Sequence, residues 1–182
     1  TAEQVADEPA EVVEETETPI SDLSIAVLPF DNRSNLPEDE FFVEGMHDDL
    51  LTTLAKIGSM KVISRTSVME YRDGSKKLPH IAKELGVGNI LAGGGQRSGS
   101  QVRINVQLID AESEGHLWAE QYEGELTVAN IFQMQSEIAA AITEALRAQL
   151  TESELESIAR APTEDFDAYQ DYLQGLVYFR ES

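Results

Sequence analysis

The chain has 182 residues, 41% of them hydrophobic, and its 34 acidic and 13 basic residues give a formal net charge of −21 at pH 7. This length predicts one ordinary domain with extensions, and the charge argues against binding to nucleic-acid phosphates or to an anionic membrane surface, which need clustered Lys and Arg. The absence of cysteine excludes a disulfide scaffold and a cysteine nucleophile, and no apolar stretch is long enough to span a bilayer.

Residues 1–22 are strongly acidic, and no basic residue precedes Arg33. Because mutually repelling carboxylates with few apolar neighbours favour extended chain, this segment is interpreted as a flexible linker, either a spacer or a segment with no role. An alternative is a frayed amphipathic helix around residues 10–17. The start at Thr1, with no initiating Met and no signal-peptide pattern, predicts a fragment of a longer protein.

The first part of the ordered region, from Leu23 onward, alternates strands with helices. Short apolar runs predict strands, and apolar residues at helical spacing predict amphipathic helices that end at glycines. Strands are expected at 24–30 and 61–64, and helices at 38–57, before Gly58, and around 81–85, before Gly86. The segment 66–72 is ambiguous and could form one helical turn.

A meander of strands follows. Residues 102–108 alternate apolar with polar side chains, which is typical of a half-buried strand, and Ser98-Gly99-Ser100 has the composition of a hairpin turn. Neighbouring strands are expected from residue 89 into Gly93-Gly94-Gly95 and over 116–122, where Leu117, Ala119 and Trp118 would contribute to packing. A second long amphipathic helix is expected over 131–150.

This order of elements predicts a mixed sheet of about five strands with two long and one or two short helices packed on it. The fold class is therefore α/β, in the two-layer α+β form, over residues 23–150. Residues 151–182 form a separate region, in which Thr151 and Glu154 fit a capping box and Tyr169 lies in a helix with an apolar side. That last helix either folds back on the domain or begins a helical hairpin.

Fragments spread over residues 23–150 resemble, in order, the TolB amino-terminal-like domain family. They are SIAVLPFDN at 24–32, Phe42 with EGM at 44–46, VISRTS at 62–67, ELGV at 84–87, RSG at 97–99, VRI at 102–104, QLIDA at 107–111, HLWAE at 116–120, and Phe132 with Gln135 and Glu137 to Ala139. In one departure, Ala92 to Gly95 replaces an acidic-Gly-Ser pattern, so a local bulge or close backbone approach is expected there.

The resemblance implies a non-catalytic bacterial domain, found beside class III nucleotide cyclases, winged-helix regulators and tetratricopeptide repeats. The stretch from Tyr172 to Tyr178 is similar to the first helix of such a repeat. The function hypothesis is therefore a sensor or protein-interaction module of a larger signalling or envelope protein, with a protein partner. The alternative is an accessory domain of an adenylate or guanylate cyclase. A periplasmic or other extracytoplasmic position is expected, and monomer and homodimer both stay open.

Candidate chemistry is sparse in the sequence. The three consecutive glycines lead into a strand rather than a helix and no Lys-Ser or Lys-Thr follows, so they are interpreted as a strand distortion, with anion binding as the lesser alternative. His47, Asp48 and Asp49 are adjacent on a helix and point apart, which predicts a solvated helix face rather than a metal site. Glu44, Glu84 and Glu120 have no evident His or Lys partner. No catalytic residue, metal ligand or cofactor is predicted.

Six residues are candidates for contact with a ligand or partner. Arg65, between the hydroxyl residues Ser64 and Thr66, follows a predicted strand and could receive a carboxylate, or it could hold the following loop to the domain. Trp118, with Tyr122 and Tyr71, could form an exposed aromatic patch, although packing is the simpler interpretation. Tyr172 and Tyr178 complete the set, in the C-terminal helix.

Overall fold

The computed structural model describes residues 21–34, 36–146, 152 and 165–181. The acidic segment 1–20, the predicted capping box at Thr151 and Glu154, and the end of the second long helix at Leu150 lie outside these described residues.

A six-stranded mixed sheet forms the centre of the domain, in the order β3-β1-β4-β5-β6, with β2 paired to β4. The strands on one side are parallel, whereas β4, β5 and β6 form an antiparallel meander. The strands are β1 (Ser24–Val27), β2 (Asp31–Asn32), β3 (Lys61–Val62), β4 (Asn89–Ser98), β5 (Gln101–Asp110) and β6 (His116–Glu125).

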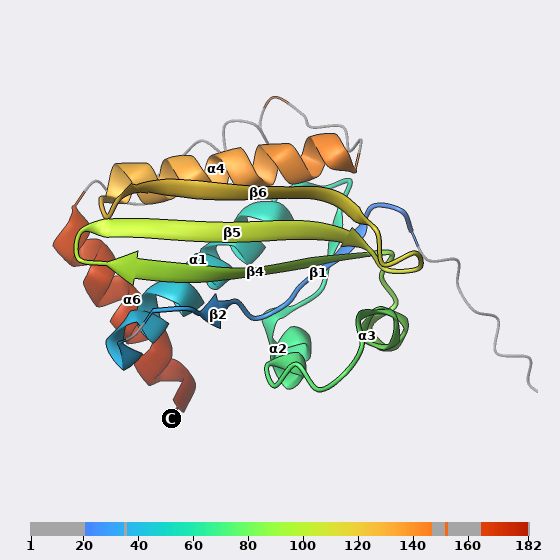
Figure 1. The fold of residues 1–182 in the computed structure, drawn as a ribbon, viewed down its shortest axis with the longest axis horizontal. Coiled ribbons are helices and arrows are strands. Elements are labelled where there is room, and N and C mark those ends of the chain that lie inside the picture. Colours follow the sequence, from blue (N-terminus) through green and yellow to red (C-terminus); the bar gives the residue numbers. More distant parts are fainter. Residues whose placement is uncertain (1–20, 35, 147–151, 153–164, 182) are drawn as a thin grey trace, which may run out of the picture.

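Helices pack on both faces of this sheet. Two long helices cover one face, and two short helices cover the parallel end of the other (Figure 1). The helical segments are a 3-10 turn at Pro37–Asp39, α1 (Glu40–Ala55), α2 (Arg65–Val68), a second 3-10 turn at Met69–Tyr71, α3 (Leu78–Leu85), α4 (Val128–Ala145) and α6 (Phe166–Glu181). The predicted fold class is confirmed, and the ambiguous segment 66–72 is helical.

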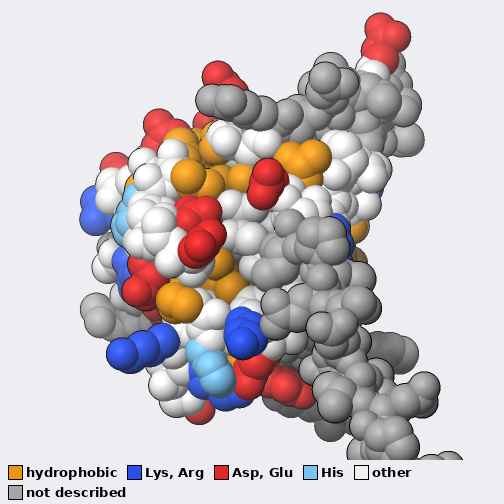
Figure 2. Space-filling model, turned by 90° about the vertical axis from the view of Figure 1, so that its right-hand side faces the viewer, with side chains coloured by type: hydrophobic (Ala, Val, Ile, Leu, Met, Phe, Trp, Pro, Cys, Tyr) orange, Lys and Arg blue, Asp and Glu red, His pale blue; other side chains and the backbone are white. Residues whose placement is uncertain are grey.

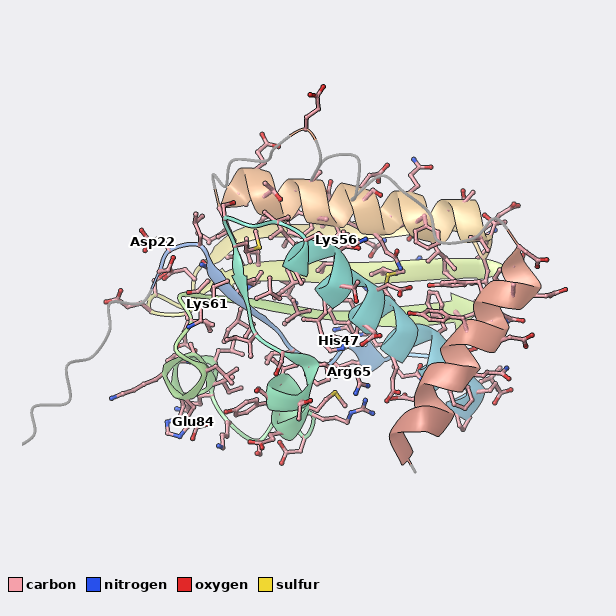
Figure 3. The ribbon with its side chains drawn as sticks, turned by 180° about the vertical axis from the view of Figure 1, so that it is seen from behind. Asp22, His47, Lys56, Lys61, Arg65 and Glu84 are labelled. Atoms are coloured by element: carbon pink, nitrogen blue, oxygen red, sulfur yellow. The ribbon has the colours of Figure 1, made fainter. Side chains whose placement is uncertain are left out.

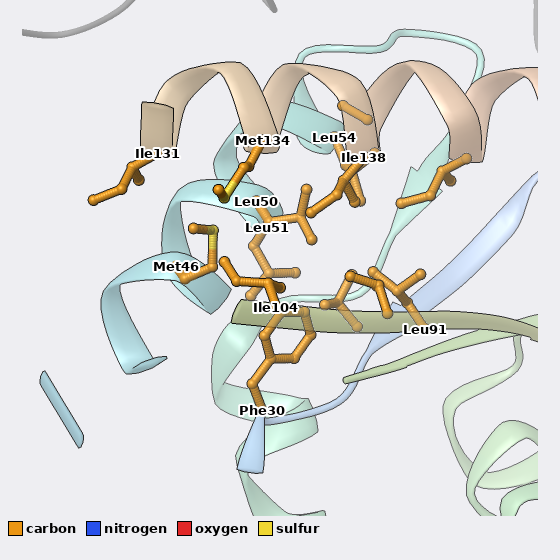
Figure 4. Close-up of a cluster of buried hydrophobic side chains, with 14 of the residues drawn as sticks. Phe30, Met46, Leu50, Leu51, Leu54, Leu91, Ile104, Ile131, Met134 and Ile138 are labelled. Carbon is orange, nitrogen blue, oxygen red and sulfur yellow. The ribbon is translucent and has the colours of Figure 1, made fainter. Parts of the chain in front are cut away.

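The main hydrophobic core lies between the sheet and the helices α1 and α4 (Figure 4). Strand β5 contributes every second side chain to it, as its alternation predicts, and the four side chains from Val102 to Leu108 are at most 2% exposed. Leu50 of α1 and Ile138 of α4 pack on them from above. A smaller core, which includes Ala26 and Ile81, fills the space between the opposite face and α2 and α3.

Local signals set the ends of several elements. Gly86 ends α3 in a left-handed conformation with φ of 63°, as a C-terminal glycine does. Gly99 takes φ of 62° in the two-residue turn between β4 and β5. Thr127 begins α4, and its side chain accepts a hydrogen bond from the Asn130 backbone N–H at 3.2 Å.

The three glycines of β4 do not form a bulge, so that part of the prediction is wrong, but the close backbone approach is confirmed. Pairing of β4 with β5 is continuous, and the register shift lies instead between Leu108 and Ile109 of β5. A Cβ atom at Gly93 would lie 2.7 Å from the Asn105 carbonyl oxygen, and one at Gly95 would lie 3.0 Å from Val43. Glycine is present because neighbouring atoms occupy the space of a side chain.

On strand β6 the expected packing of Trp118 is confirmed, whereas the expected packing of Leu117 and Ala119 is wrong. Trp118 pairs with Leu108 and packs against the main core, whereas Leu117 is 48% exposed and Ala119 is also exposed. The reason is tertiary, because α4 covers only one face of this strand. In the described part of the chain, no helix covers the other face of β5 and β6 (Figure 1).

Candidate functional site

A buried polar contact joins three helices where α6 lies against the domain. Asp49 of α1 accepts a hydrogen bond from the Tyr169 hydroxyl of α6 at 2.8 Å and one from Gln135 Nε2 of α4 at 3.2 Å. Tyr169 is 1% exposed and Gln135 is 2% exposed. We call these three residues the α6 seam. Through it, the C-terminal helix packs on the domain, which is one of the two arrangements expected for that helix.

The electrostatics of the α6 seam follow from its burial. Burial raises the pKa of the Asp49 carboxyl, and the hydrogen bonds from Tyr169 and Gln135 oppose that rise without cancelling it. Burial, followed by the charge of Asp49, also raises the pKa of Tyr169. The tyrosine hydroxyl therefore stays protonated as a donor at neutral pH, and the arrangement is suited to holding helices together.

Burial of His47 and Asp49 overturns the prediction of a solvated helix face. His47 is 2% exposed and Asp49 is 9% exposed, because α1 is enclosed by the sheet, by α4 and by α6. Amphipathic spacing identifies one buried side of a helix, but α1 is covered on several sides, so residues outside the apolar stripe are buried as well. Sequence reasoning missed the α6 seam for this reason.

His47 is held by the strand beneath it. Its Nε2 donates a hydrogen bond to the Val27 carbonyl oxygen at 2.9 Å, and its ring centroid lies 5.8 Å from that of Phe30. Burial lowers the pKa of His47, and the hydrogen bond to Val27 only partly offsets this. The described residues hold no group of three or more His, Asp or Glu side chains placed to bind a metal ion.

Arg65 contacts α1 from the start of α2 (Figure 3). Its guanidinium lies 3.8 Å from Glu44 and 3.5 Å from Asp48, and Arg72 forms further ion pairs with Glu44 and with Glu40. Arg65 thus receives carboxylates from its own domain. The side chains of Arg65, Glu44 and Asp48 are partly buried, and their ion pairs connect the segment that contains α2 to α1.

The residues flanking Arg65 are near it in sequence but do not join its contacts. Ser64 precedes α2, and its hydroxyl lies 3.1 Å from that of Ser67, while Thr66 is exposed. Contact of Ser64, Arg65 and Thr66 with a ligand or partner stays a prediction.

Glu84 of α3 has the basic partners that sequence reasoning did not find. Lys76 Nζ lies 2.7 Å from its carboxylate and His80 Nε2 lies 3.3 Å away, and the Tyr71 hydroxyl donates to it at 2.9 Å. The hydrogen bond from Lys76, followed by the one from Tyr71, lowers the pKa of Glu84. The cluster attaches α3 to the turn before it.

The predicted aromatic residues do not form one patch. The rings of Trp118 and Tyr122 lie 6.4 Å apart against the main core, whereas Tyr71 belongs to the smaller core on the other face of the sheet. Tyr172 is 45% exposed on α6, with its ring 6.4 Å from that of Tyr169. The side chain of Tyr178 lies outside the described residues.

A small groove of about 50 Å³ runs along the same junction as the α6 seam. Arg97, at the end of β4, lines the groove, and its Nη1 lies 3.4 Å from Oδ1 of the buried Asp39. The remaining lining comes from the first 3-10 turn, the start of α1, the segment that leads into α4, α4 itself and α6: Glu38, Phe41, Phe42, Leu126, Ile131, Phe166, Tyr169, Gln170 and Gln174. Asp49 does not line it.

Across the described parts of the chain, no helix is both long and apolar enough to cross a membrane.

Comparison with known sequences finds a matching family model and a matching relative. A family model described as "HilA/YgeH-like transcriptional regulator, second domain" matches residues 21–143. A protein of Rhizobium meliloti (strain 1021) named "Putative adenylate cyclase 3" is 38% identical over 159 residues. The match covers 86% of this chain and 27% of that protein, so the chain spans about a quarter of the length of its relative.

Comparison with solved structures finds the same fold at low sequence identity. TolB from Acinetobacter baumannii matches with a TM-score of 0.52 and 18% identity over 72% of this chain and 30% of that one. Lipoprotein GNA1162 from Neisseria meningitidis matches with a TM-score of 0.50 and 17% identity over 71% of this chain and 99% of that one. The resemblance to TolB therefore holds at the level of the fold.

Proposed function

This chain belongs to the family of HilA/YgeH-like transcriptional regulator second domains, and from this premise we propose that it is a non-catalytic accessory domain of a larger bacterial regulatory protein. Its role is to contact other protein segments and to pass the resulting change in position to the helices that follow it. A protein partner, rather than a nucleic acid or a membrane, is the expected ligand.

The α6 seam is the observation that carries this proposal. A helix that follows the domain in sequence places its tyrosine into a buried polar contact shared by α1 and α4. Buried hydrogen bonds to a carboxylate are sensitive to small displacements, because each partner left unpaired costs about 1–3 kcal/mol. A contact that shifts α1 or α4 would therefore change how firmly α6 is held.

The other ionisable clusters support a role in contact rather than in chemistry. Glu44 joins α1 to α2 through arginines, and Glu84 joins α3 to Tyr71 and Lys76. Each carboxylate is engaged by a partner from another part of the fold. These carboxylates are therefore occupied by contacts within the fold, each exposed ion pair contributing at most about 1 kcal/mol.

We extend the proposal to the parts of the chain beyond the domain. In this arrangement residues 1–22 form a linker, residues 23–150 the domain, and residues 151–182 the start of a tetratricopeptide-repeat region. The similarity of the stretch from Tyr172 to Tyr178 to a first repeat helix supports this division. An extracytoplasmic position is supported by the fold shared with a lipoprotein.

A second candidate function is an accessory domain of a nucleotide cyclase. The observation that favours it is the 38% identity to a protein named as an adenylate cyclase, of which this chain spans 27%. In this alternative the catalytic domain lies elsewhere in the parent protein, and α6 connects this domain to the rest of it.

Hydrogen exchange measured by mass spectrometry tests the coupling. Gln135→Leu, in α4, should speed exchange of α6 amides around Tyr169 by about tenfold or more, because a lost hydrogen bond to a carboxylate costs about 1.5–3 kcal/mol. Gln133→Leu is the matched control, since Gln133 is exposed on the same helix and its side chain donates to Glu137 at 2.9 Å. Equal exchange of α6 in both variants would contradict the proposal.

Activity measurements complete the test. The purified chain should not turn over esters, phosphates, glycosides or ATP, and turnover that survives repurification would overturn the non-catalytic role. The cyclase alternative is examined in the full-length parent, where Gln135→Leu should change cyclic nucleotide production and Gln133→Leu should not.

A further inference from the structure

Positive charge is concentrated on one part of this acidic protein. Six of the 13 Lys and Arg residues lie between residues 61 and 84, a stretch with three acidic residues, although the chain has 34. In Figure 2 the end of the molecule that carries α3 faces the viewer, and Lys and Arg side chains gather on its lower part with a histidine. We call the exposed residues on and beside α3 the basic face: Lys61, Lys76, Lys77, His80 and Lys83.

Part of this positive charge is not neutralised within the described residues. Lys76 and His80 share the carboxylate of Glu84. Lys61 Nζ lies 3.4 Å from the Gly86 carbonyl oxygen, at the C-terminal end of α3. Lys77 and Lys83 are exposed and make no ion pair with any described side chain. Exposed cations of this kind attract an anionic segment, and the attraction extends over about one Debye length.

The chain enters the fold beside this face. Asn89 Nδ2 donates to the Asp22 carbonyl oxygen at 2.8 Å, and the Lys61 backbone N–H donates to the Leu23 carbonyl oxygen at 3.0 Å. The Gly88 N–H donates to Ser24 Oγ at 2.9 Å. Asp22, Lys61 and α3 therefore lie at the same end of the molecule (Figure 3). The segment that precedes Asp22 is attached within reach of the basic face.

We propose that the acidic segment of residues 1–20 docks on the basic face of its own chain. This segment carries seven carboxylates and no Lys or Arg: Glu3, Asp7, Glu8, Glu11, Glu14, Glu15 and Glu17. Twenty residues can extend over roughly 60 Å, whereas a helix of the length of α3 spans about 12 Å. The segment is thus long enough to lie along α3 from its attachment at residue 21, with its carboxylates beside Lys77 and Lys83.

Covalent attachment makes this weak contact effective. An exposed ion pair contributes at most about 1 kcal/mol, but a short tether gives a local concentration on the order of millimolar. The docked segment shields the basic face, so a partner with an acidic surface must displace it before binding there. The contact is electrostatic and therefore weakens as salt is added.

Paramagnetic relaxation enhancement tests the docking directly. Because the chain has no cysteine, Ala10→Cys provides a unique site for a nitroxide label. The label should broaden the amide signals of Lys77, His80 and Lys83 at low salt, by at least about twofold in intensity. The broadening should disappear at about 0.5 M NaCl, where the Debye length is roughly 4 Å, and in the double variant Lys77→Glu, Lys83→Glu.

Matched controls separate docking from general charge effects. The double variant Lys56→Glu, Arg103→Glu makes the same change in net charge at exposed positions outside the basic face and should keep the broadening. Carbodiimide treatment of the unaltered chain should join carboxylates of residues 1–20 to Lys77 or Lys83. The proposal is overturned if broadening persists in the Lys77→Glu, Lys83→Glu variant, if it is absent from α3, or if it arises only between chains in mixed samples.

Discussion

At the scale of single residues, the buried ionisable groups of α1 have opposite effects on the pH dependence of stability. Burial raises the pKa of Asp49 and lowers that of His47, because in each case it disfavours the charged form. The contribution of neutral His47 to the unfolding free energy is lost as the pH falls below the pKa of an unfolded histidine. The contribution of protonated Asp49 to the unfolding free energy is present at acid pH and is lost as the pH rises through its raised pKa.

Replacement of Asp49 by asparagine isolates its contribution. The side chain keeps its shape and no longer titrates, so the unfolding free energy of Asp49→Asn should rise relative to the parent as the pH increases above about 4. Each unit of pKa difference corresponds to about 1.4 kcal/mol. Urea unfolding at a series of pH values measures this difference.

Asp110→Asn is the control for this series. Hydrogen bonds from Ser113 lower the pKa of Asp110, so its contribution is present above the pKa of an unfolded aspartate and is lost on acidification. The Asp110→Asn variant should therefore become less stable than the parent as the pH rises. Parallel curves for Asp49→Asn and the parent would show that Asp49 is not held in a low-polarity environment.

At the scale of elements, β4 has close neighbours around its three consecutive glycines. It is paired to β1, β2 and β5, and the ring of Phe30 and the side chain of Val43 lie against its glycines. The strand can occupy this central position because its backbone carries no side chains there. The glycine run is thus part of a continuous strand.

Gly93→Ala measures this restriction. The added Cβ would lie 2.7 Å from the Asn105 carbonyl oxygen and 3.1 Å from Phe30, so we expect a loss of about 1–3 kcal/mol in unfolding free energy. Gly115→Ala is the control, because the nearest atom to its Cβ is the hydroxyl oxygen of Ser113, at the end of a side chain that can move. Its effect should stay within about 0.5 kcal/mol. Similar values for the two variants would mean that β4 has room to shift.

At the scale of the whole molecule, the attachment of α6 decides whether a change in the domain reaches the C-terminal helix. Helix α6 contacts α1 through Tyr169 and carries Tyr172 toward solvent. If α6 unfolds together with the sheet, a change in the domain reaches the C-terminal helix. If it unfolds separately, the two parts are independent.

Two tyrosines of α6 distinguish these cases. Tyr169 is 1% exposed, so Tyr169→Ala should lower the free energy of the main unfolding transition by about 3–5 kcal/mol. Tyr172 is 45% exposed, and Tyr172→Ala should lower it by less than half as much. Denaturant unfolding followed by circular dichroism gives both values. A main transition that is unchanged in Tyr169→Ala would place α6 outside the cooperative unit.

Local periodicity and backbone chemistry were sufficient to predict the fold class, the alternation of β5, the end of α3 at Gly86 and the hairpin at Gly99. These features depend on neighbours along the chain, which the sequence displays directly. Burial of Asp49 and His47, exposure of Leu117 and packing of Tyr169 against the domain depend on which surfaces of an element are covered by others. Only the tertiary structure decides that, because contacts between distant segments bury residues outside the apolar stripe of their own helix or strand.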